Sequence, residues 1–513
     1  MLGLSTYLVL SIVFLVVYLV NWRRRIAKLP PGPPRLPLIG NLHQAPKGTL
    51  WLTFQKWIDQ YGPLVSVDFG GTNIIIVGDF ETARDLLDKR GNVYNGRPRL
   101  VMAGELVTKG MDQLFRDHGE EFFLHQRLAA STMSPRASSC YTPIQNYESK
   151  RIMQDFLSSN DYKHHFERFS ASIVYTLIFG LRIETGKEPQ FVTSEKNLEN
   201  LVQAGNPGTW IVDTFPFLNY LPAPFTPWKK TAEEWFQGVT MSAKMNLDDA
   251  LQRDGWNWAK DFVKAKEASQ MTEIEVAWDL EIICSAGIET TNVQLQIFTL
   301  ACIANPEAVR KAQAELDAVI GPDRLPTFDD IDKLPYIHAM IEETFRWRHI
   351  LPTGIPHATT QDDYYNGYLI PKKSTIIPLF IAMRNDASLF DNPSHFRPER
   401  WLGKQQQSAN FGYGRRICTG RHIARNSMFI AISRLLWGFN IRSKSGEKMV
   451  IREDMFTPDF VSHPKPFGAL FEVRSEQRKE VMIREWETED GDVGTMLDGV
   501  RERMVGVGLR PRA

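Results

Sequence analysis

The hydrophobic pattern of the chain begins with an almost unbroken apolar run at the N-terminus. Between Leu2 and Val20, polarity is limited to serine and threonine hydroxyls and tyrosines, and a bilayer-spanning helix needs about 20 apolar residues. A basic cluster follows at once, at Arg23, Arg24, Arg25 and Lys28. A cleavable signal peptide has its positive charge before the apolar core, so this reversed order predicts an anchor that leaves the bulk of the chain in the cytosol. We predict a transmembrane helix over residues 1–21, with a buried core helix as the alternative.

After this segment, the pattern predicts a linker and one large domain. Residues 22–34 are basic and proline-rich, and proline favours an extended, non-helical chain. Turn residues at Gly70–Gly71 and Asn366–Gly367 lie between β-rich runs and predict two tight hairpins. Most other long segments have helical periodicity, for example through Met428, Ile432, Leu435, Leu436 and Phe439. We expect a mainly α fold with small β-sheets over residues 35–474.

The last part of the chain, residues 475–513, differs from this domain in composition. It is charged, contains glycine and has only weak periodicity. The pattern predicts a short helix followed by a partly disordered tail.

Composition narrows the classes of function. With 513 residues, 43% of them hydrophobic, the chain has enough apolar material for a large core. Its formal net charge is zero and no basic stripe alternates with aromatic residues, so no nucleic-acid partner is expected. The four cysteines are scattered without the spacing of a zinc site. Reduced thiols are therefore expected, and not a disulfide framework.

One short stretch, FGYGRRICTG (Phe411–Gly420), concentrates the candidate chemistry. Gly412 and Gly414 allow the backbone to bend and to approach a flat, bulky group. Cys418 precedes a predicted helix, whose dipole and free amides lower the pKa of a thiol. Arg416 adds a cation that suits a carboxylate. A thiolate in this setting can be a nucleophile or a metal ligand, whereas a lone cysteine before a helix is more often a small hydrophobic residue.

This stretch resembles the haem-binding signature of the cytochrome P450 superfamily, Phe-x-x-Gly-x-Arg-x-Cys-x-Gly, at every fixed position. Three further segments resemble family motifs in the family's order: AGIETT (Ala286–Thr291), ETFR (Glu343–Arg346) and FRPERW (Phe396–Trp401). The apolar N-terminus and the PPGPP hinge are similar to those of eukaryotic microsomal members. The resemblance spans residues 1–474 and is strongest to fungal members that tailor secondary metabolites. It implies the cytochrome P450 fold, a large helical haem domain with small β-sheets.

The resemblance also implies roles for individual residues. Cys418 is the implied axial ligand of the haem iron, because a thiolate favours O–O cleavage. Glu289 and Thr290 are the implied catalytic acid–alcohol pair that relays protons during oxygen activation; alone, this segment would be an amphipathic core helix. The other implied haem-binding residues are Arg416, Phe411, Gly414, Gly420 and His357. A buried structural network is implied for Glu343, Arg346 and Arg400.

Two features depart from the family pattern. The family's Trp-x-x-x-Arg pair, which contacts the haem propionates, is represented here by Phe122 and Gln126. Arg127 lies one residue further, about 100° round a helix, and is no simple substitute. The loop between Arg400 and Phe411 is also shorter than family members generally have.

The implied function is that of a membrane-anchored haem-thiolate monooxygenase. It would contain haem b and insert one atom of O2 into a lipophilic organic substrate. NADPH would act only indirectly, through NADPH-cytochrome P450 reductase, for which Arg415, Arg421 and Arg425 are a candidate dock or simply a solvated helix face. The implied location is the endoplasmic reticulum membrane, a single pass through the lipid bilayer with the catalytic domain facing the cytosol.

Three alternatives stay open at this point. One is oxidative coupling or rearrangement on the same haem-thiolate centre, which no motif excludes. Another is a haem-impaired, non-catalytic membrane protein, which Gln126 and the short loop before Phe411 favour and the intact Cys418, Glu289 and Thr290 oppose. The third concerns the apolar run at residues 215–228, which is either a membrane contact or a packed loop core.

Overall fold

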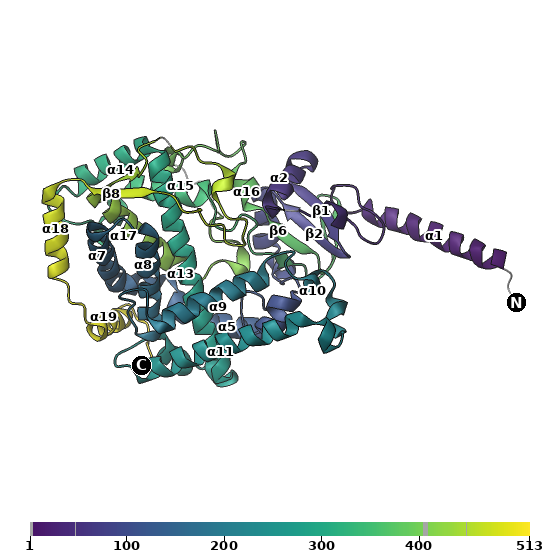
Figure 1. Ribbon diagram of the computed structural model, residues 1–513, viewed down its shortest axis with the longest axis horizontal. Helices are drawn as coiled ribbons and strands as arrows, with labels where there is room; N and C mark the ends of the chain where they lie inside the picture. The colour runs from purple at the N-terminus through teal and green to yellow at the C-terminus, as the bar shows by residue number, and fades with distance from the viewer. Residues whose placement is uncertain (1–3, 47, 404–408, 448, 513) are drawn as a thin grey trace.

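The computed structural model describes residues 4–46, 48–403, 409–447 and 449–512. Helices make up most of the body, accompanied by small β-sheets (Figure 1), so the mainly helical fold expected from the sequence is confirmed. The longer helices are α1 (Leu4–Ile26), α2 (Leu50–Tyr61), α5 (Glu120–Met133), α7 (Thr142–Ser158), α8 (Tyr162–Phe179), α9 (Pro189–Gly205), α11 (Pro227–Gln252), α13 (Glu273–Ala304), α14 (Pro306–Val319), α15 (Pro335–Trp347), α17 (Arg421–Gly438), α18 (Glu476–Glu487) and α19 (Val493–Gly506). The shorter ones are α3 (Phe80–Ala83), α4 (Gly91–Tyr94), α6 (Pro135–Ser138), α10 (Ile211–Thr214), α12 (Trp258–Val263) and α16 (Phe380–Arg384). The strands are β1 (Leu64–Phe69), β2 (Thr72–Val77), β3 (His357–Ala358), β4 (Asp363–Tyr365), β5 (Tyr368–Ile370), β6 (Thr375–Pro378), β7 (Phe439–Ser443) and β8 (Ala469–Val473).

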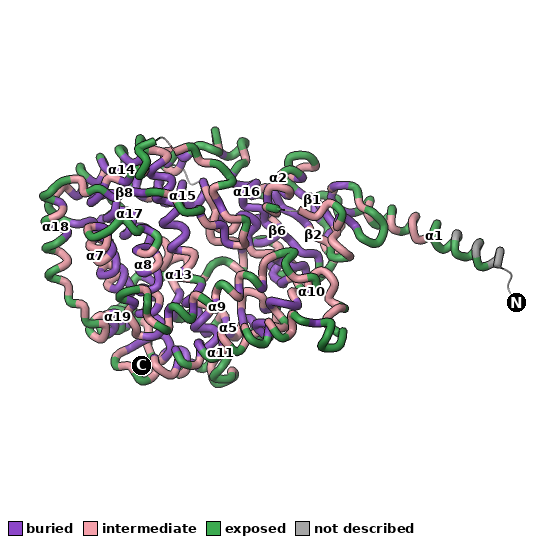
Figure 2. The backbone as a smooth tube through the Cα atoms, viewed as in Figure 1, coloured by how far each residue is buried: buried purple, intermediate pink, exposed green. Residues whose placement is uncertain are grey.

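The long helix α13 runs through the middle of the helical body (Figure 1). It begins with a capping box, in which the Glu275 amide donates to Thr272 Oγ1 at 3.3 Å and the Thr272 amide donates to Glu275 Oε2 at 2.7 Å. The helices α8, α11, α15 and α17 pack against it. Figure 2 shows the buried residues gathered along this set of helices. The packing fixes the height and rotation of the AGIETT segment in the centre of the protein.

Both predicted hairpins are confirmed. Strands β1 and β2 pair antiparallel around Gly70–Gly71, whose φ angles are 63° and 93°, and β4 and β5 pair around Asn366–Gly367 at 51° and 81°. Two successive positive φ values are those of the tight turn that glycine and asparagine favour. In the four-stranded sheet β1-β2-β6-β3, His357 on β3 lies opposite Ile376 on β6. This pairing brings a histidine from late in the sequence next to the N-terminal sheet.

The first helix, α1, projects away from the body (Figure 1). None of its described side chains is buried, and the apolar Phe14 is 75% exposed (Figure 2). Within the residues that the structure describes, no helix combines the length and apolar character needed to cross a membrane. The transmembrane span predicted for residues 1–21 is therefore not supported, although a helix does form there.

The C-terminal residues contain two helices, α18 and α19, where the sequence predicted one short helix and a partly disordered remainder. Leu497, Val500 and Met504 on α19 are 0%, 0% and 3% exposed. Their spacing of three and four residues gives α19 one apolar face, which packs against α7. The difference arises because apolar residues interspersed with charged residues and glycines are a weak signal in the sequence.

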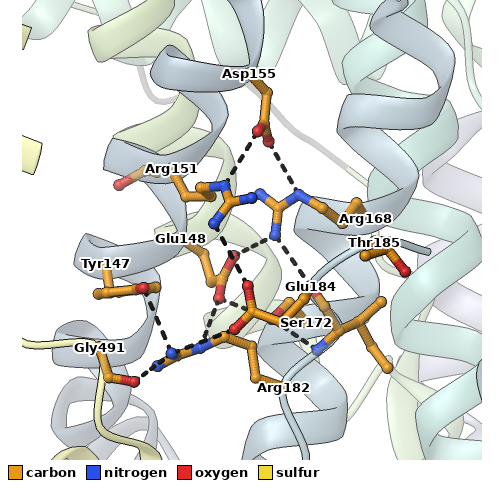
Figure 3. A network of polar contacts seen from close by, with 12 residues as sticks. Tyr147, Glu148, Arg151, Asp155, Arg168, Ser172, Arg182, Glu184, Thr185 and Gly491 are labelled. Carbon is orange, nitrogen blue, oxygen red and sulfur yellow. Dashed lines mark hydrogen bonds and ion pairs between the residues drawn. The ribbon is translucent and has the colours of Figure 1, made fainter. Parts of the chain in front are cut away.

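A buried ion-pair network ties this C-terminal segment to α7 and α8 (Figure 3). Arg168 Nη1 donates to Glu148 Oε2 at 2.8 Å, and Arg168 Nε donates to Asp155 Oδ2 at 3.0 Å. Beside them, Arg182 donates to the carbonyl oxygen of Gly491, between α18 and α19. The buried charges are paired, as burial requires. The connection between the two last helices is thus held to the helical body by hydrogen bonds.

Candidate active site

The loop around Cys418 is a closed turn between the short helix η10 (Gly414–Arg416) and α17. The Cys418 amide donates to the Phe411 carbonyl at 2.8 Å, and Gly412 has a φ of 80°. A Cβ on Gly414 would collide with the Leu87 carbonyl oxygen, whereas a Cβ on Gly420 would meet nothing within 4 Å. Gly414 therefore serves the packing of the loop on its own protein. Gly420 is the glycine that leaves space beside the sulfur.

The Cys418 thiol is exposed on one side and crowded by protein on the others. Burial raises its pKa, and the amides of Gly420 and Arg421, with the Arg421 charge, lower it by less. The helix-terminus effect expected from the sequence is present, but the net direction is the opposite one. A metal ion reverses this balance, because a coordinating thiol loses its proton. Cys418 is thus better suited to be a metal ligand than a free nucleophile.

Phe411 opens the loop and covers one side of it. Its ring lies 5.3 Å from that of Phe345 on α15, edge to face, and the Arg425 guanidinium stands 5.0 Å from its centroid. These contacts hold the ring on the α15 and α17 side of the loop.

Arg416 points away from solvent and is fixed by main-chain oxygens. It donates to the carbonyls of Asn95 at 2.9 Å and Arg116 at 2.9 Å, and its guanidinium lies 3.6 Å from the Phe122 ring centroid. Burial lowers its pKa to about 10. Such a buried cation is stabilised by an anion beside it.

Two further basic residues, Arg97 and His357, lie near Arg416. The sequence prediction missed Arg97. Arg97 donates to the carbonyls of Leu114 at 2.8 Å and Pro356 at 2.7 Å. Burial, then repulsion from Arg416, holds the pKa of Arg97 well below its ordinary value. The ring of His357 is almost fully buried, at 5% exposure, and its Nδ1 donates to the Tyr94 carbonyl at 2.8 Å. Burial, then Arg97, lowers the pKa of His357 to about 3.

We define Arg97, Arg416 and His357 as the basic cluster. Buried polar atoms of Asn95 and Arg116 lie next to it, and the described residues provide no hydrogen-bond partner for the Asn95 amide group or for Arg116 Nη1. Unpaired buried donors are rare in native proteins and call for an additional partner. An anionic group with several oxygens would accept hydrogen bonds from the two donors, Asn95 Nδ2 and Arg116 Nη1.

On α5, Phe122 and Gln126 stand in place of the family's Trp–Arg pair and make different contacts. Phe122 is buried under Arg416, and Gln126 Nε2 donates to the Arg415 carbonyl at 3.0 Å. Arg127 is exposed on another face of the helix, as its position predicted. Gln126 therefore braces the cysteine loop and supplies no charge. Arg97 is a second buried cation beside Arg416, and the sequence NGRPRL offers no signal that separates it from the exposed Arg99.

The AGIETT segment on α13 presents its residues in different directions. Ala286 is exposed, but a Cβ on Gly287 would lie 2.7 Å from Val174 Cγ1 on α8. Gly287 is thus required for helix packing, and Ala286 is the small residue that lies on the open side of the helix. Thr290 Oγ1 donates to the Ala286 carbonyl at 2.8 Å, and Glu289 Oε1 lies 3.1 Å from His463 Nε2. The two relay candidates therefore bond different neighbours in this state.

The predicted Glu–Arg–Arg network is present and buried. Glu343 is 0% exposed; its carboxylate accepts from Arg346 Nη2 at 2.7 Å and from Arg400 Nε at 3.2 Å. The Arg397 amide and Trp401 Nε1 complete its partners at 2.8 and 2.9 Å. The network fastens α15 to the segment before the cysteine loop. Most of the short connection that follows, residues 404–408, lies outside the described residues.

These residues fit the haem that the resemblance implies. Cys418 supplies a soft axial ligand, Gly420 leaves space for a flat ring beside the sulfur, and the basic cluster with its unpaired neighbours suits two carboxylates. Within the described residues, no group of three or more His, Cys, Asp or Glu side chains could hold a free metal ion.

Comparison with known proteins gives an independent result. The family model of cytochrome P450 matches residues 30–471. The chain is 39% identical to the cytochrome P450 monooxygenase drtD of Aspergillus calidoustus over 511 residues, covering 97% of this chain and 96% of that protein. It is 37% identical to the cytochrome P450 monooxygenase FrzL of a Cladobotryum species, covering 95% and 96%. A third relative, the cytochrome P450 monooxygenase aneD of Aspergillus aculeatus, is 37% identical, covering 91% and 93%.

Proposed function

This chain is an oxygenase enzyme of the cytochrome P450 family, and from that premise we propose that it inserts one atom of dioxygen into a lipophilic organic substrate. The observation that carries the proposal is the single thiol of Cys418 beside the buried basic cluster. We propose a fungal secondary metabolite as the substrate class, supported by the identity to monooxygenases from Aspergillus and Cladobotryum.

Each part of the site has its own task. Bound haem b would supply an iron centre for dioxygen activation, with the Cys418 thiolate holding the iron. Arg97 and Arg416 would hold its carboxylates; His357, whose Nδ1 donates to the Tyr94 carbonyl, would join them through Nε2 once a nearby carboxylate favours its protonated form. Phe411 would cover the sulfur. Ala286 keeps the α13 face open for the substrate. The exposed thiol side and the buried basic cluster would together favour one orientation of the ring.

The experiment that tests the proposal supplies purified protein with a reductase, NADPH and ¹⁸O2. One labelled oxygen atom in the product would support monooxygenation. An oxidised product without label would show coupling or dehydrogenation on the same centre. Product formation that persists without the reductase and NADPH would overturn the electron source that we propose.

Thr290 is proposed to pass protons through its hydroxyl. Its Oγ1 donates to the Ala286 carbonyl, which leaves the oxygen lone pairs free to accept a proton from solvent or Glu289. The Thr290→Ala enzyme is expected to divert NADPH electrons to hydrogen peroxide, with product per NADPH falling by about tenfold or more. The measurement is the ratio of product and peroxide to NADPH consumed.

Thr299→Ala is the matched control for Thr290→Ala. Thr299 lies on the same helix and makes the same kind of bond, from Oγ1 to the Leu295 carbonyl at 3.0 Å, but it is fully buried away from the motif. The control variant should keep normal coupling. Full coupling in Thr290→Ala as well would exclude the hydroxyl from proton delivery.

Electrons are proposed to come from NADPH-cytochrome P450 reductase, a separate protein. Arg415 is exposed beside the cysteine loop and is the basic residue best placed to meet an acidic partner. Arg421 donates to the Cys418 carbonyl at 2.8 Å, and Arg425 pairs with Glu342. These two arginines are thus partly used within the protein, which makes Arg415 the central residue of the proposed dock.

We also propose that the enzyme is attached to the endoplasmic reticulum membrane through α1, with the body in the cytosol. Support comes from the exposed apolar side chains of α1 and the arginines in its last turn. Phe217 and Tyr220 add exposed apolar surface at 65% and 81%. They follow Phe215, which approaches Gly70, as does Leu42, a few residues after the proline-rich linker.

Removal of residues 2–26 is expected to shift the protein from the microsomal pellet toward the supernatant. The shift should be incomplete because the apolar surface at Phe217 and Tyr220 remains. Sedimentation with and without a high-salt wash measures it. Turnover with soluble substrate and reductase is the control for folding, and recovery of the full chain in the supernatant would contradict membrane attachment.

A further inference from the structure

The carboxylate of Glu289 has a partner that comes from a distant part of the chain. His463 Nε2 lies 3.1 Å from Glu289 Oε1, across a sequence separation of 174 residues. In the described part of the chain, no other hydrogen bond or ion pair of the Glu289 side chain is present. Whatever orients this carboxylate on the exposed side of α13 therefore comes from His463.

The loop that carries His463 is braced on both sides of the histidine. The Thr457 amide donates to the His463 carbonyl at 2.8 Å, and the His463 amide donates back to Thr457 Oγ1 at 3.1 Å. Ser462 Oγ donates to the Thr457 carbonyl at 3.0 Å, and the Ser462 amide donates to the Ile350 carbonyl at 2.8 Å. Four hydrogen bonds thus fix the backbone from which the imidazole reaches α13.

The side chain of Glu289 is less exposed to solvent than that of His463. The side chain of Glu289 is 17% exposed and that of His463 is 33% exposed. A half-buried carboxylate with one hydrogen-bond partner takes up fewer rotamers than a solvated one, and a partner that remains in water loses less hydration on binding it. The contact therefore selects a carboxylate orientation at small cost in desolvation.

We propose that His463 is a positioning residue of the proton relay: its imidazole keeps the Glu289 carboxylate against the protein and out of bulk solvent, next to Thr290 in the sequence of α13. The proposal rests on the relay role in the proposed function. Without the imidazole, the Glu289 side chain would be free to rotate into solvent, and proton delivery would fall behind electron delivery. The excess electrons would then leave as hydrogen peroxide.

The experiment compares His463→Ala, His463→Gln and Glu289→Gln in the full-length holoenzyme. His463→Ala is expected to raise the peroxide formed per NADPH by about 3- to 10-fold, the effect of losing one positioning hydrogen bond. His463→Gln should restore most of the coupling, because its amide can donate from nearly the same place as Nε2. Lys465→Ala, an exposed side chain on the same loop, is the control and should behave as wild type.

A second readout does not depend on turnover. The melting temperatures of His463→Ala, Glu289→Gln and the double variant form a double-mutant cycle. If the two side chains touch, the double variant should lose less than the sum of the two single losses. Additive losses would overturn the contact and the proposal with it.

The outcomes separate the proposal from the function on which it rests. If Glu289→Gln leaves coupling intact, the relay itself is absent. If Glu289→Gln uncouples the enzyme and His463→Ala does not, only the role of His463 is overturned. That role is also overturned if His463→Gln is as uncoupled as His463→Ala, since a hydrogen bond then does not explain the effect.

Discussion

The Cys418→Ala protein is expected to fold and to lose all NADPH-driven turnover. The hydrogen bond that closes the loop runs from the Cys418 amide to the Phe411 carbonyl, so an alanine keeps it. The side chain is exposed on one side, and removing one exposed atom changes the free energy of unfolding by about 0.5 kcal/mol or less. The sulfur, in contrast, is irreplaceable as an anionic soft ligand at this position. Stability and catalysis should therefore separate in this variant.

The measurement for Cys418→Ala is the carbon monoxide difference spectrum of the dithionite-reduced protein, taken with turnover. Wild type should show the strongly red-shifted Soret band of a thiolate-ligated haem, and Cys418→Ala should lack it. Cys140→Ala is the control, because Cys140 is buried at 2% exposure on another part of the protein and should keep the band. A red-shifted band in Cys418→Ala would assign the ligand to another residue.

Local patterns in the sequence were enough to predict the features that depend on neighbouring residues. The turns at Gly70–Gly71 and Asn366–Gly367 form as expected because positive φ angles are a property of those residues. The helix α17 buries Met428 and Leu435, as its periodicity predicted. The Glu–Arg–Arg network followed from resemblance, and its geometry agrees.

Contacts between distant segments were beyond the reach of the sequence. Arg97 joins Arg416 only because the loops after α4 and before α17 meet, and His463 meets Glu289 only because a C-terminal loop folds over α13. The sequence also did not reveal which groups the open side of each glycine faces. Gly414 faces the Leu87 carbonyl oxygen, whereas the sequence suggested that it faces a ligand, and Gly287 in the AGIETT motif likewise faces Val174 of the protein. Which side of a residue is open depends on the tertiary structure.

The predicted lowering of the Cys418 pKa was wrong for a similar reason. The sequence reveals a helix start after the cysteine, and the amides of Gly420 and Arg421 do lower the pKa. It does not reveal how much protein surrounds the sulfur, and burial has the larger effect. The helix α19 shows the same limit. Which of its apolar residues are buried depends on the part of the protein against which the helix packs.

The Glu343→Gln variant is expected to lose stability and haem together. The substitution keeps the volume of the side chain but removes the charge that Arg346 and Arg400 share, and both arginines are buried at 3% and 4% exposure. Breaking a buried ion pair from one side costs about 3–5 kcal/mol, since the remaining charges stay unpaired. The loss should reach the haem site because Arg397 and Trp401, just before the cysteine loop, also bond this carboxylate.

Thermal unfolding and haem content per protein measure the effect of Glu343→Gln, and the chain offers a matched control. Glu307 pairs with Arg310 at the same i,i+3 spacing on α14, but these side chains are 64% and 65% exposed. Glu307→Gln should cost at most about 0.5 kcal/mol and leave the haem content unchanged, because water screens an exposed pair. Equal effects of the two substitutions would mean that burial adds nothing to the Glu343 network, and another contact would then have to hold the cysteine loop. A large loss of stability and haem for Glu343→Gln alone would show that an i,i+3 Glu–Arg pair stabilises the protein when it is buried and contributes little when it is exposed.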